Sequence, residues 1–174
     1  LAGIWQVNEQ LNVNALKWMM GNADWLTLST YSTTILADST KNIEVIFDAQ
    51  NSIEGSYLAD LVMSSNDPLM PEISISAVMN VTGIPEISVK EDSINFGEMY
   101  VGYGGTVELL IENPGTAVLD IISITTSDPF SAAPTSLTIA PFGEETVEVT
   151  FLPTTSFSES PLIIESNNAG DISV

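Results

Sequence analysis

The sequence of 174 residues contains neither cysteine nor histidine. Without cysteine the chain forms no disulfide bond, and cysteine usage gives no indication of the redox compartment. Without histidine it lacks the commonest general base and the commonest metal ligand. A serine nucleophile would have to use one of three scattered lysines as its base. The sequence therefore predicts that the chain is not an enzyme and has no catalytic or cofactor-binding residue.

Positive charge is almost as scarce. Lys17, Lys41 and Lys90 are the only cations against 23 acidic residues, and the net charge is −20. Phosphate backbones are bound by clustered lysine and arginine, so nucleic acid is excluded as a partner. The acidic residues are dispersed along the chain, as expected for the solvated outer faces of strands. Such a surface suits divalent cations or a basic partner.

Long apolar runs are missing as well. No stretch approaches the ~18 apolar residues of a membrane-spanning helix, so the sequence predicts no membrane insertion. The chain begins at Leu1 without a signal peptide, and we interpret it as a processed or excised piece of a longer protein.

Hydrophobic residues make up 44% of the sequence, enough to build packed cores. They occur mostly in short runs that alternate with polar residues and are separated by glycine, proline and asparagine, a pattern typical of half-buried strands. The predicted strands of the first half are 5–13, 16–20, 25–28, 43–47, 57–63 and 73–81. Those of the second half are 87–89, 94–96, 107–111, 119–124, 137–139, 147–151 and 162–164, with 172–174 beginning a last one.

The two halves repeat each other. Phe151 corresponds to Phe47, Asn167 to Asn66, and the strand at 119 to the strand at 16, and each pair lies roughly one hundred residues apart, as tandem domains would. A period of that length suits immunoglobulin-sized sandwiches. We therefore predict an all-β chain of two tandem Ig-like antiparallel β-sandwiches, 1–84 and 85–174, with the boundary at Gly83-Ile84-Pro85.

The alignment of the halves also predicts incomplete edges. The first sandwich lacks the leading strand that the second has at 87–101, and the last strand of the second sandwich is truncated. Two interpretations stay open: the boundaries of the piece fall there, or a neighbouring chain supplies the missing strand, because unpaired edges favour strand addition.

The second half resembles the Ig-like modules of the ASPM/SPD-2/Hydin type and the bacterial choice-of-anchor D repeats. The matching motifs, spread over 86–174, are Ile-Asn-Phe-Gly at 94–97, Ile-Glu-Asn-Pro-Gly-Thr-Ala-Val-Leu at 111–119, Asp-Pro-Phe at 128–130, Ile-Ala-Pro-Phe-Gly at 139–143 and Val-Glu-Val-Thr-Phe-Leu-Pro at 147–153. The first half is similar to degenerate relatives of this module, at 25–29, 45–48, 55–57 and 65–68. The resemblance implies stalk, spacer or adhesive modules of large surface proteins, with no shared catalytic residue.

Few residues are candidates for a binding site. Trp5, Trp18 and Trp25 could stack on a sugar, although tryptophans in a sandwich are usually core; Trp5, near a chain end, is the best ligand candidate. Asn66 and Asp67, together with Asp171, are weak candidates for Ca²⁺, which takes oxygen ligands from loops. No ordered ligand spacing accompanies them, so no metal site and no cofactor is otherwise predicted.

These observations lead to one favoured function. We expect a non-catalytic extracellular structural module, a stalk, spacer or filament subunit of a large secreted or cell-surface protein from a bacterium or archaeon, assembling through strand edges. Its partners would be neighbouring Ig-like domains, copies of the same chain, or a surface glycan or protein. Two alternatives stay open: a carbohydrate- or protein-binding adhesin module, and an accessory domain of a larger secreted enzyme. The predicted core residues are Trp18, Phe47, Tyr57, Leu61, Phe96, Ile111, Leu119 and Phe151.

Overall fold

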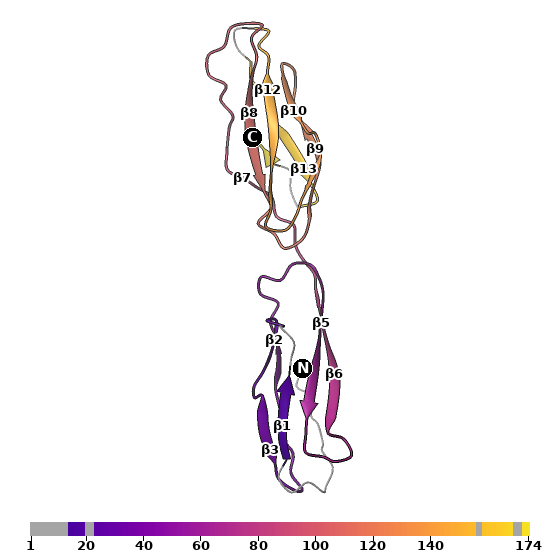
Figure 1. Ribbon diagram of the computed structural model, residues 1–174. Coiled ribbons are helices and arrows are strands. Elements are labelled where there is room, and N and C mark those ends of the chain that lie inside the picture. Colours follow the sequence, from indigo (N-terminus) through magenta and orange to yellow (C-terminus); the bar gives the residue numbers. More distant parts are fainter. Residues whose placement is uncertain (1–13, 20–22, 156–157, 169–171) are drawn as a thin grey trace. The chain divides into compact units, whose positions relative to one another are not determined.

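The computed structural model describes residues 14–19, 23–155, 158–168 and 172–174, with the backbone alone for 14–19. Fourteen strands make up its regular structure (Figure 1). No helix long and apolar enough to cross a bilayer occurs in this part of the chain. The chain divides into two compact units, Leu1–Val81 and Thr82–Val174, whereas the sequence placed the boundary after residue 84.

The second unit is a sandwich of two four-stranded antiparallel sheets. One has the order β10-β12-β8-β7 and the other the order β11-β9-β13-β14. The strands are β7 (Ser88–Val89), β8 (Gly105–Glu112), β9 (Leu119–Thr125), β10 (Phe130–Ala133), β11 (Leu137–Ile139), β12 (Glu144–Phe151), β13 (Ile163–Ser166) and β14 (Ile172–Ser173). Alternate apolar residues of β8, β9, β12 and β13 are buried between the sheets, and this burial excludes most of the unit's apolar surface from water.

Asn113 joins three segments at one end of this sandwich. Its side chain is fully buried, and its Nδ2 donates to the carbonyl oxygens of Ala117, Ile139 and Ala140 at 2.9–3.1 Å. Its Oδ1 accepts from the backbone N–H groups of Glu86 and Gly115. A buried amide is tolerated only when it is hydrogen-bonded in this way. The asparagine of the Asn-Pro-Gly motif therefore has a structural role.

The first unit has a four-stranded sheet of order β3-β1-β5-β6 and, among the described residues, a two-stranded sheet of β2 and β4. The strands are β1 (Asn14–Met19), β2 (Leu26–Leu28), β3 (Ser32–Ile35), β4 (Val45–Phe47), β5 (Gly55–Ser64) and β6 (Glu72–Val81). The core contains Leu26, Leu28, Ile35, Ile43, Leu61, Met63 and Ala77. β5 and β6 form a long hairpin, paired in one register from Gly55↔Val81 to Ser64↔Glu72.

The two units share a strand order. Strand by strand, the order β3-β1-β5-β6 in the first unit matches the order β11-β9-β13-β14 in the second unit. The pair β2-β4 likewise matches the pair β10-β12. The counterparts of β7 and β8 are not among the described residues of the first unit. The strand predicted at 5–13, the only candidate for them, lies outside the described residues.

Several predictions about strands and core differ from the structure. Phe47 is 41% exposed instead of buried, because it ends the short outer strand β4 and packs against Trp25 at a ring distance of 5.8 Å. Tyr57 and Phe96 are half-buried, whereas Leu61, Ile111, Leu119 and Phe151 are buried as expected. The side chain of Trp18 lies outside the described residues.

The strand predicted at 94–96 does not form. Ile94 and Phe96 still pack against the core of the second unit, but the segment between β7 and β8 passes the neighbouring strands without pairing with them. Two real strands, β3 and β10, were not predicted. Both are edge strands of four residues, Ser-Thr-Thr-Ile and Phe-Ser-Ala-Ala, too short to show the alternation that marks the central strands.

Candidate binding groove

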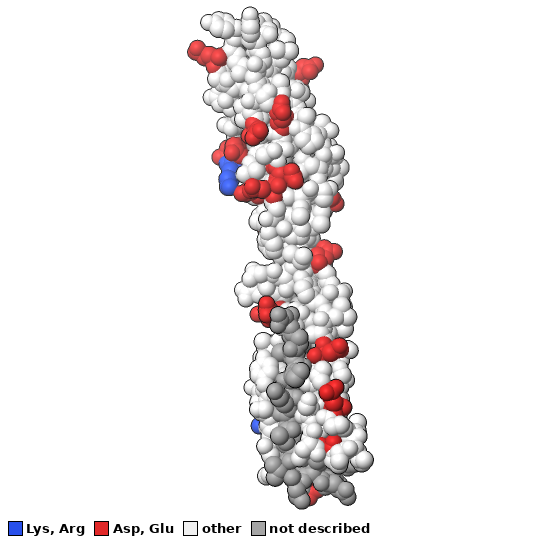
Figure 2. All heavy atoms as spheres, in the orientation of Figure 1, with Lys and Arg blue, Asp and Glu red and all other residues white. Residues whose placement is uncertain are grey.

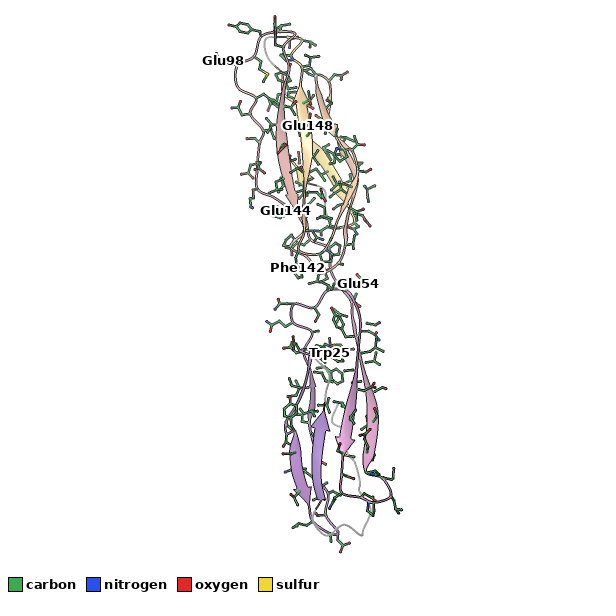
Figure 3. The ribbon with its side chains drawn as sticks, viewed as in Figure 1. Trp25, Glu54, Glu98, Phe142, Glu144 and Glu148 are labelled. Carbon is green, nitrogen blue, oxygen red and sulfur yellow. The ribbon has the colours of Figure 1, made fainter. Side chains whose placement is uncertain are left out.

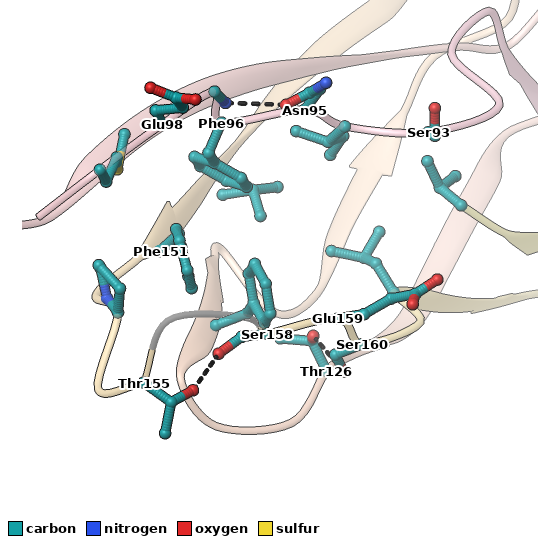
Figure 4. Close-up of a pocket in the computed structure, with 18 of the residues that line it drawn as sticks. Ser93, Asn95, Phe96, Glu98, Thr126, Phe151, Thr155, Ser158, Glu159 and Ser160 are labelled. Atoms are coloured by element: carbon teal, nitrogen blue, oxygen red, sulfur yellow. Dashed lines mark hydrogen bonds between the residues drawn. The ribbon is translucent and has the colours of Figure 1, made fainter. Parts of the chain in front are cut away.

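A groove with a volume of about 930 Å³ opens on one side of the second unit (Figure 4). One wall is the segment 93–100, between β7 and β8. The opposite wall is formed by described residues between β12 and β13, namely Pro153, Thr155, 158–160 and Leu162, and residues of β10 and β12 form the floor. A smaller hollow shares Ser93, Ile94, Glu159, Ser160 and Val174 with it and adds Asp92 and Pro161. The two hollows therefore form one continuous groove.

Three phenylalanines form the apolar centre of the groove. Phe130 and Phe151 are directly opposite each other on β10 and β12, with stacked rings 4.5 Å apart. Phe96 reaches them from the first wall, at ring distances of 5.9 Å to Phe130 and 5.4 Å to Phe151. Phe96 and Phe130 stay half-buried, so part of this aromatic surface faces the groove and is available for contact.

Local hydrogen bonds hold both walls in place. On the first wall, the Oδ1 of Asn95 accepts from the N–H of Gly97 at 2.8 Å. On the second, the Oγ of Ser160 lies 3.3 Å from the hydroxyl of Thr126 and accepts from the N–H of Ser127. Backbone hydrogen bonds fix the ends of the walls as well, from the N–H of Gly102 to the carbonyl oxygen of Pro153 and from the N–H of Tyr103 to that of Tyr100.

Strand β14 ends at the entrance of the groove. Val174 and Leu162 exchange two backbone hydrogen bonds of 3.0 Å, one in each direction, and these continue the β13–β14 ladder. Val174 lines both hollows of the groove.

The rim of the groove is acidic. Asp92, Glu98 and Glu159 are exposed and line it. Lys90 is nearby in sequence, but its Nζ is bound to Oε1 of Glu112 at 2.7 Å. The hydrogen bond and the charge of Glu112, assisted by Glu144 and Glu91, raise the pKa of Lys90 above its ordinary value. No cation lines the groove in the described part of the chain.

Further acidic residues lie on the outer face of β8 and β12. Glu108 is opposite Glu148, and Glu112 is opposite Glu144. Figure 3 shows Glu144 and Glu148 on β12, and Figure 2 shows acidic side chains spread over the visible face of this unit. Cross-strand pairs of like charge destabilise a sheet, so this face contributes charge at the expense of stability.

Of the predicted ligand and metal residues, Asn66 and Asp67 are described by the structure, and neither lines the groove. Trp5 and Asp171 lie outside the described residues. Asp67 lies in the turn between β5 and β6, where its Oδ1 accepts from the N–H groups of Leu69 and Met70 and its own N–H donates to Ser65. This carboxylate stabilises the turn, and the described residues contain no group of three acidic side chains placed to hold a metal. The Ca²⁺ site stays a prediction.

Trp25 belongs to a separate aromatic cluster in the first unit (Figure 3). Its ring lies 5.8 Å from that of Phe47 and 6.2 Å from that of Tyr57, and Tyr57 donates to the carbonyl oxygen of Ile53. Trp25 is half-buried and packs against the core, so it contributes mainly to folding, as expected for a tryptophan in a sandwich.

The sequence contained signals for the groove. Phe96 and Phe151 were predicted as core residues, whereas Phe130 follows a proline in a strand that was not recognised. Their meeting depends on which strands pair, because Phe130↔Phe151 is a register contact. The motifs at 94–97, 128–130 and 147–153 each contribute one of the three rings. The family motifs therefore include all three phenylalanines, but they do not indicate that a groove opens beside them.

Comparison with known proteins identifies the second unit. The model of the "HYDIN/CFA65/VesB-like, Ig-like domain" matches residues 85–173. Curated proteins gave no match.

Solved structures resemble the fold at low identity. A Porphyromonas gingivalis W83 protein of unknown function is 17% identical, with a TM-score of 0.44, over 95% of this chain and 85% of that one. The YadV chaperone is 14% identical (TM-score 0.35, covering 96% and 88%). The CupB2 chaperone of Pseudomonas aeruginosa is 9% identical (TM-score 0.31, covering 97% and 88%).

The favoured function is contradicted by these findings. We expected an extracellular stalk, spacer or filament subunit, but several solved structures of similar fold are chaperones, including the periplasmic chaperone SfaE, and two are chaperone complexes, one with the SafA pilin and one with a tip adhesion subunit. A sequence pattern that marks alternating strands identifies the sandwich, but it does not distinguish a module that spaces other domains from one that binds a protein segment.

Proposed function

We propose that this chain, which belongs to the HYDIN/CFA65/VesB-like Ig-like domain family, is a non-catalytic module that binds an extended segment of another protein. Within that family we place it beside the ASPM/SPD-2/Hydin-type and choice-of-anchor D modules, on its motifs at 94–97 and 111–119. We extend the Ig-like assignment to the first unit, because its strand order β3-β1-β5-β6 repeats β11-β9-β13-β14.

The observation that carries the proposal is the groove of the second unit. A volume of about 930 Å³ lies at the upper end of the range for small-ligand pockets. It is elongated, open and bordered by two chain segments, so its form suits a peptide better than a compact molecule. Phe96, Phe130 and Phe151 supply the partly exposed aromatic centre that protein interfaces commonly use as an anchor.

The proposed binding involves no chemical reaction. Binding would draw on the burial of apolar side chains against the phenylalanines and on hydrogen bonds to the walls, and we propose that neither a metal nor a cofactor takes part. We place the module outside the cytoplasm, at the envelope or surface of a bacterial or archaeal cell. A net charge of −20 supports a basic partner, because opposite charge accelerates association.

A permanently unfolded basic protein tests the proposal, for example reduced and carboxamidomethylated ribonuclease A. Its affinity for the full chain is measured by fluorescence anisotropy, and the contact surface by amide chemical shifts. We expect saturable binding, with shifts concentrated in 93–99 and 158–162. Ile94→Trp, which enlarges a half-buried side chain on the first wall of the groove, should weaken binding about tenfold or more.

A matched control is Phe142→Ala. Phe142 is 58% exposed, lies in the same unit and does not line the groove, so this variant should bind as the wild type does. Phe96→Ala serves as a second groove variant, with its thermal unfolding recorded to show that it folds. Absence of saturable binding, or equal binding by Ile94→Trp and Phe142→Ala, would contradict the proposal.

A further inference from the structure

A short sequence pattern at the end of β6 has no part in the groove. Asn80, Val81 and Thr82 follow one another, so an asparagine is separated from a threonine by one residue that is not proline. This is the acceptor pattern of N-linked glycosylation. No other asparagine of the sequence has a serine or threonine at that spacing. Patterns this short also occur by chance, so the surroundings of Asn80 decide whether it is an acceptor.

Asn80 is accessible on the outer face of the first unit's four-stranded sheet. Within β6, Met79 is buried and Asn80 is exposed. Its side chain therefore stands off the face of the sheet, and a further strand along the edge of β6 would not cover it. The β5–β6 ladder ends one residue later, at Gly55↔Val81, and Thr82 is exposed beyond it. Because the end of a hairpin opens at low free-energy cost, an enzyme can reach this triplet.

One hydrogen bond orients the amide of Asn80. Its Oδ1 accepts from the hydroxyl of Ser56, which is directly opposite on β5, at 2.7 Å. Its Nδ2, a donor in the amide, has no hydrogen-bond partner within the described part of the chain. N-linked sugars are attached at this nitrogen. The contact with Ser56 therefore holds the amide without engaging the atom that would react.

Two exposed apolar side chains lie next to Asn80 on the same face. Leu58 and Val78 are opposite each other on β5 and β6, two residues along from Ser56 and Asn80, and they are 73% and 52% exposed. All four side chains are uncharged, in a chain whose net charge is −20. Sugar rings have an apolar face, so a sugar on Asn80 would remove part of this apolar surface from water.

We propose that Asn80 carries an N-linked oligosaccharide whose first sugars pack on Leu58 and Val78. The donor is an oligosaccharide joined to a lipid diphosphate. The bond from the sugar C1 to the diphosphate oxygen breaks, a bond forms from C1 to Nδ2 of Asn80, and the amide loses one proton as the lipid diphosphate leaves. This inference goes beyond the proposed function. Asn80 does not line the groove, and only the location outside the cytoplasm is common to both.

Mass spectrometry of the protein from its own cells tests the attachment. Trypsin cuts after Lys41 and Lys90, so Asn80 lies in a single peptide, 42–90. We expect this peptide to be heavier by the mass of an oligosaccharide, and fragmentation to place that mass on Asn80. An unmodified peptide, or a sugar on another of its residues, would overturn the proposal.

Secretion of the full chain from yeast provides matched variants, because that pathway modifies the same triplet. The secreted wild type should carry one oligosaccharide. Thr82→Ala should abolish the attachment, and Thr82→Ser should retain it at lower occupancy. Thr106→Ala changes an exposed threonine outside the triplet and should leave the attachment unchanged. A wild type without sugar, or a sugar on Thr82→Ala, would show that this triplet is not an acceptor.

Thermal unfolding tests the packing of the sugar. All three tryptophans belong to the first unit, so their fluorescence reports on that unit. The glycosylated chain should unfold a few degrees higher than the same chain produced without sugar. This difference should vanish in Leu58→Ser and persist in Leu69→Ser, which changes an 89% exposed leucine of the β5–β6 turn. Equal differences in the two variants would refute the packing.

These outcomes are independent of the binding experiment on the groove. An unmodified Asn80 would overturn the inference and leave the binding of an unfolded protein in place. Absence of that binding, together with a sugar on Asn80, would overturn the proposed function and leave the inference in place.

Discussion

Glu108 and Glu148 lie directly opposite each other on β8 and β12, so two carboxylates occupy neighbouring positions on one outer face. Like charges in this position destabilise a sheet, typically by a fraction of 1 kcal/mol. Glu112 and Glu144 repeat the arrangement, but there Lys90 binds Glu112. The pair Glu108 and Glu148, which has no such cation among the described residues, is therefore the better position at which to measure how much free energy of unfolding the acidic surface costs.

Removal of one charge should stabilise the second unit. We expect Glu148→Gln to raise its free energy of unfolding by about 0.2–1 kcal/mol at low salt, because the repulsion from Glu108 disappears. The gain should shrink in 1 M salt, where charges are screened within ~3 Å. Urea unfolding measures both values. Glu98→Gln removes the same charge from a loop and should change little; a gain equal to that of Glu148→Gln would attribute the effect to net charge alone.

Asn113 should be among the most sensitive positions of the chain. Asn113→Ala removes a partner from three carbonyl oxygens and two N–H groups. The carbonyl of Ala140 keeps the N–H of Gly143, and each buried group that is orphaned costs about 1–3 kcal/mol. We expect a loss of at least about 3 kcal/mol in urea unfolding of the second unit.

Asn95→Ala is the matched control for that substitution. Asn95 is exposed and its side chain makes one hydrogen bond, to the N–H of Gly97, so we expect a loss of about 1 kcal/mol or less. Similar losses for the two variants would show that burial of the Asn113 network has no special weight.

Gly115 and Gly102 should respond to alanine for different reasons. A Cβ on Gly115 would lie 2.3 Å from the carbonyl oxygen of Ile84 and 2.6 Å from the N–H nitrogen of Glu86, so Gly115→Ala must move backbone and should cost more than about 2 kcal/mol. Gly102 has space around it but a φ of +84°, so Gly102→Ala should cost about 1 kcal/mol. Thermal unfolding compares them, and the reverse order would contradict the close packing at Gly115.

Lys90 should titrate above its ordinary pKa of 10.5, since Glu112 hydrogen-bonds to its charged form. A raised pKa in the folded state means that the contribution of this pair to stability is fully present below about pH 10.5 and is lost as the pH rises through the folded-state pKa. Glu112→Gln should lower the pKa of Lys90, measured by NMR of its side-chain carbons. Glu159→Gln should leave it unchanged, and an equal decrease would point to net charge as the cause.

The alternation of apolar residues in the sequence was sufficient to predict the central strands but not the edge strands. Alternation predicted β5, β6, β8, β9 and β12, where one face is buried against the other sheet. It failed for β3 and β10, because an edge strand of four residues is too short to show alternation and gains its structure from pairing. The strand predicted at 94–96 failed for the opposite reason: its apolar residues reach the core, but no strand among the described residues pairs with it.

The binding groove could be foreseen only in part. Phe96 and Phe151 were expected to be buried, and both contact the core or belong to it. Their arrangement with Phe130 depends on the register of β10 on β12, a relationship between distant residues that periodicity does not encode. The opening itself arises from an absence of pairing, and a sequence does not state which backbone groups stay unpaired.

The hydrogen bonds of Asn113 also bear on the order of folding events. They bring together residues 86, 113–117 and 139–140, so no local fluctuation can complete them. Until those distant segments meet, the amide must remain hydrated, and burying it early would be unfavourable. Contacts of long sequence separation are associated with slow folding. We therefore expect the region around Asn113 to become ordered late. Its hydrogen bonds would form, and the final packing be completed, only after both sheets have assembled correctly.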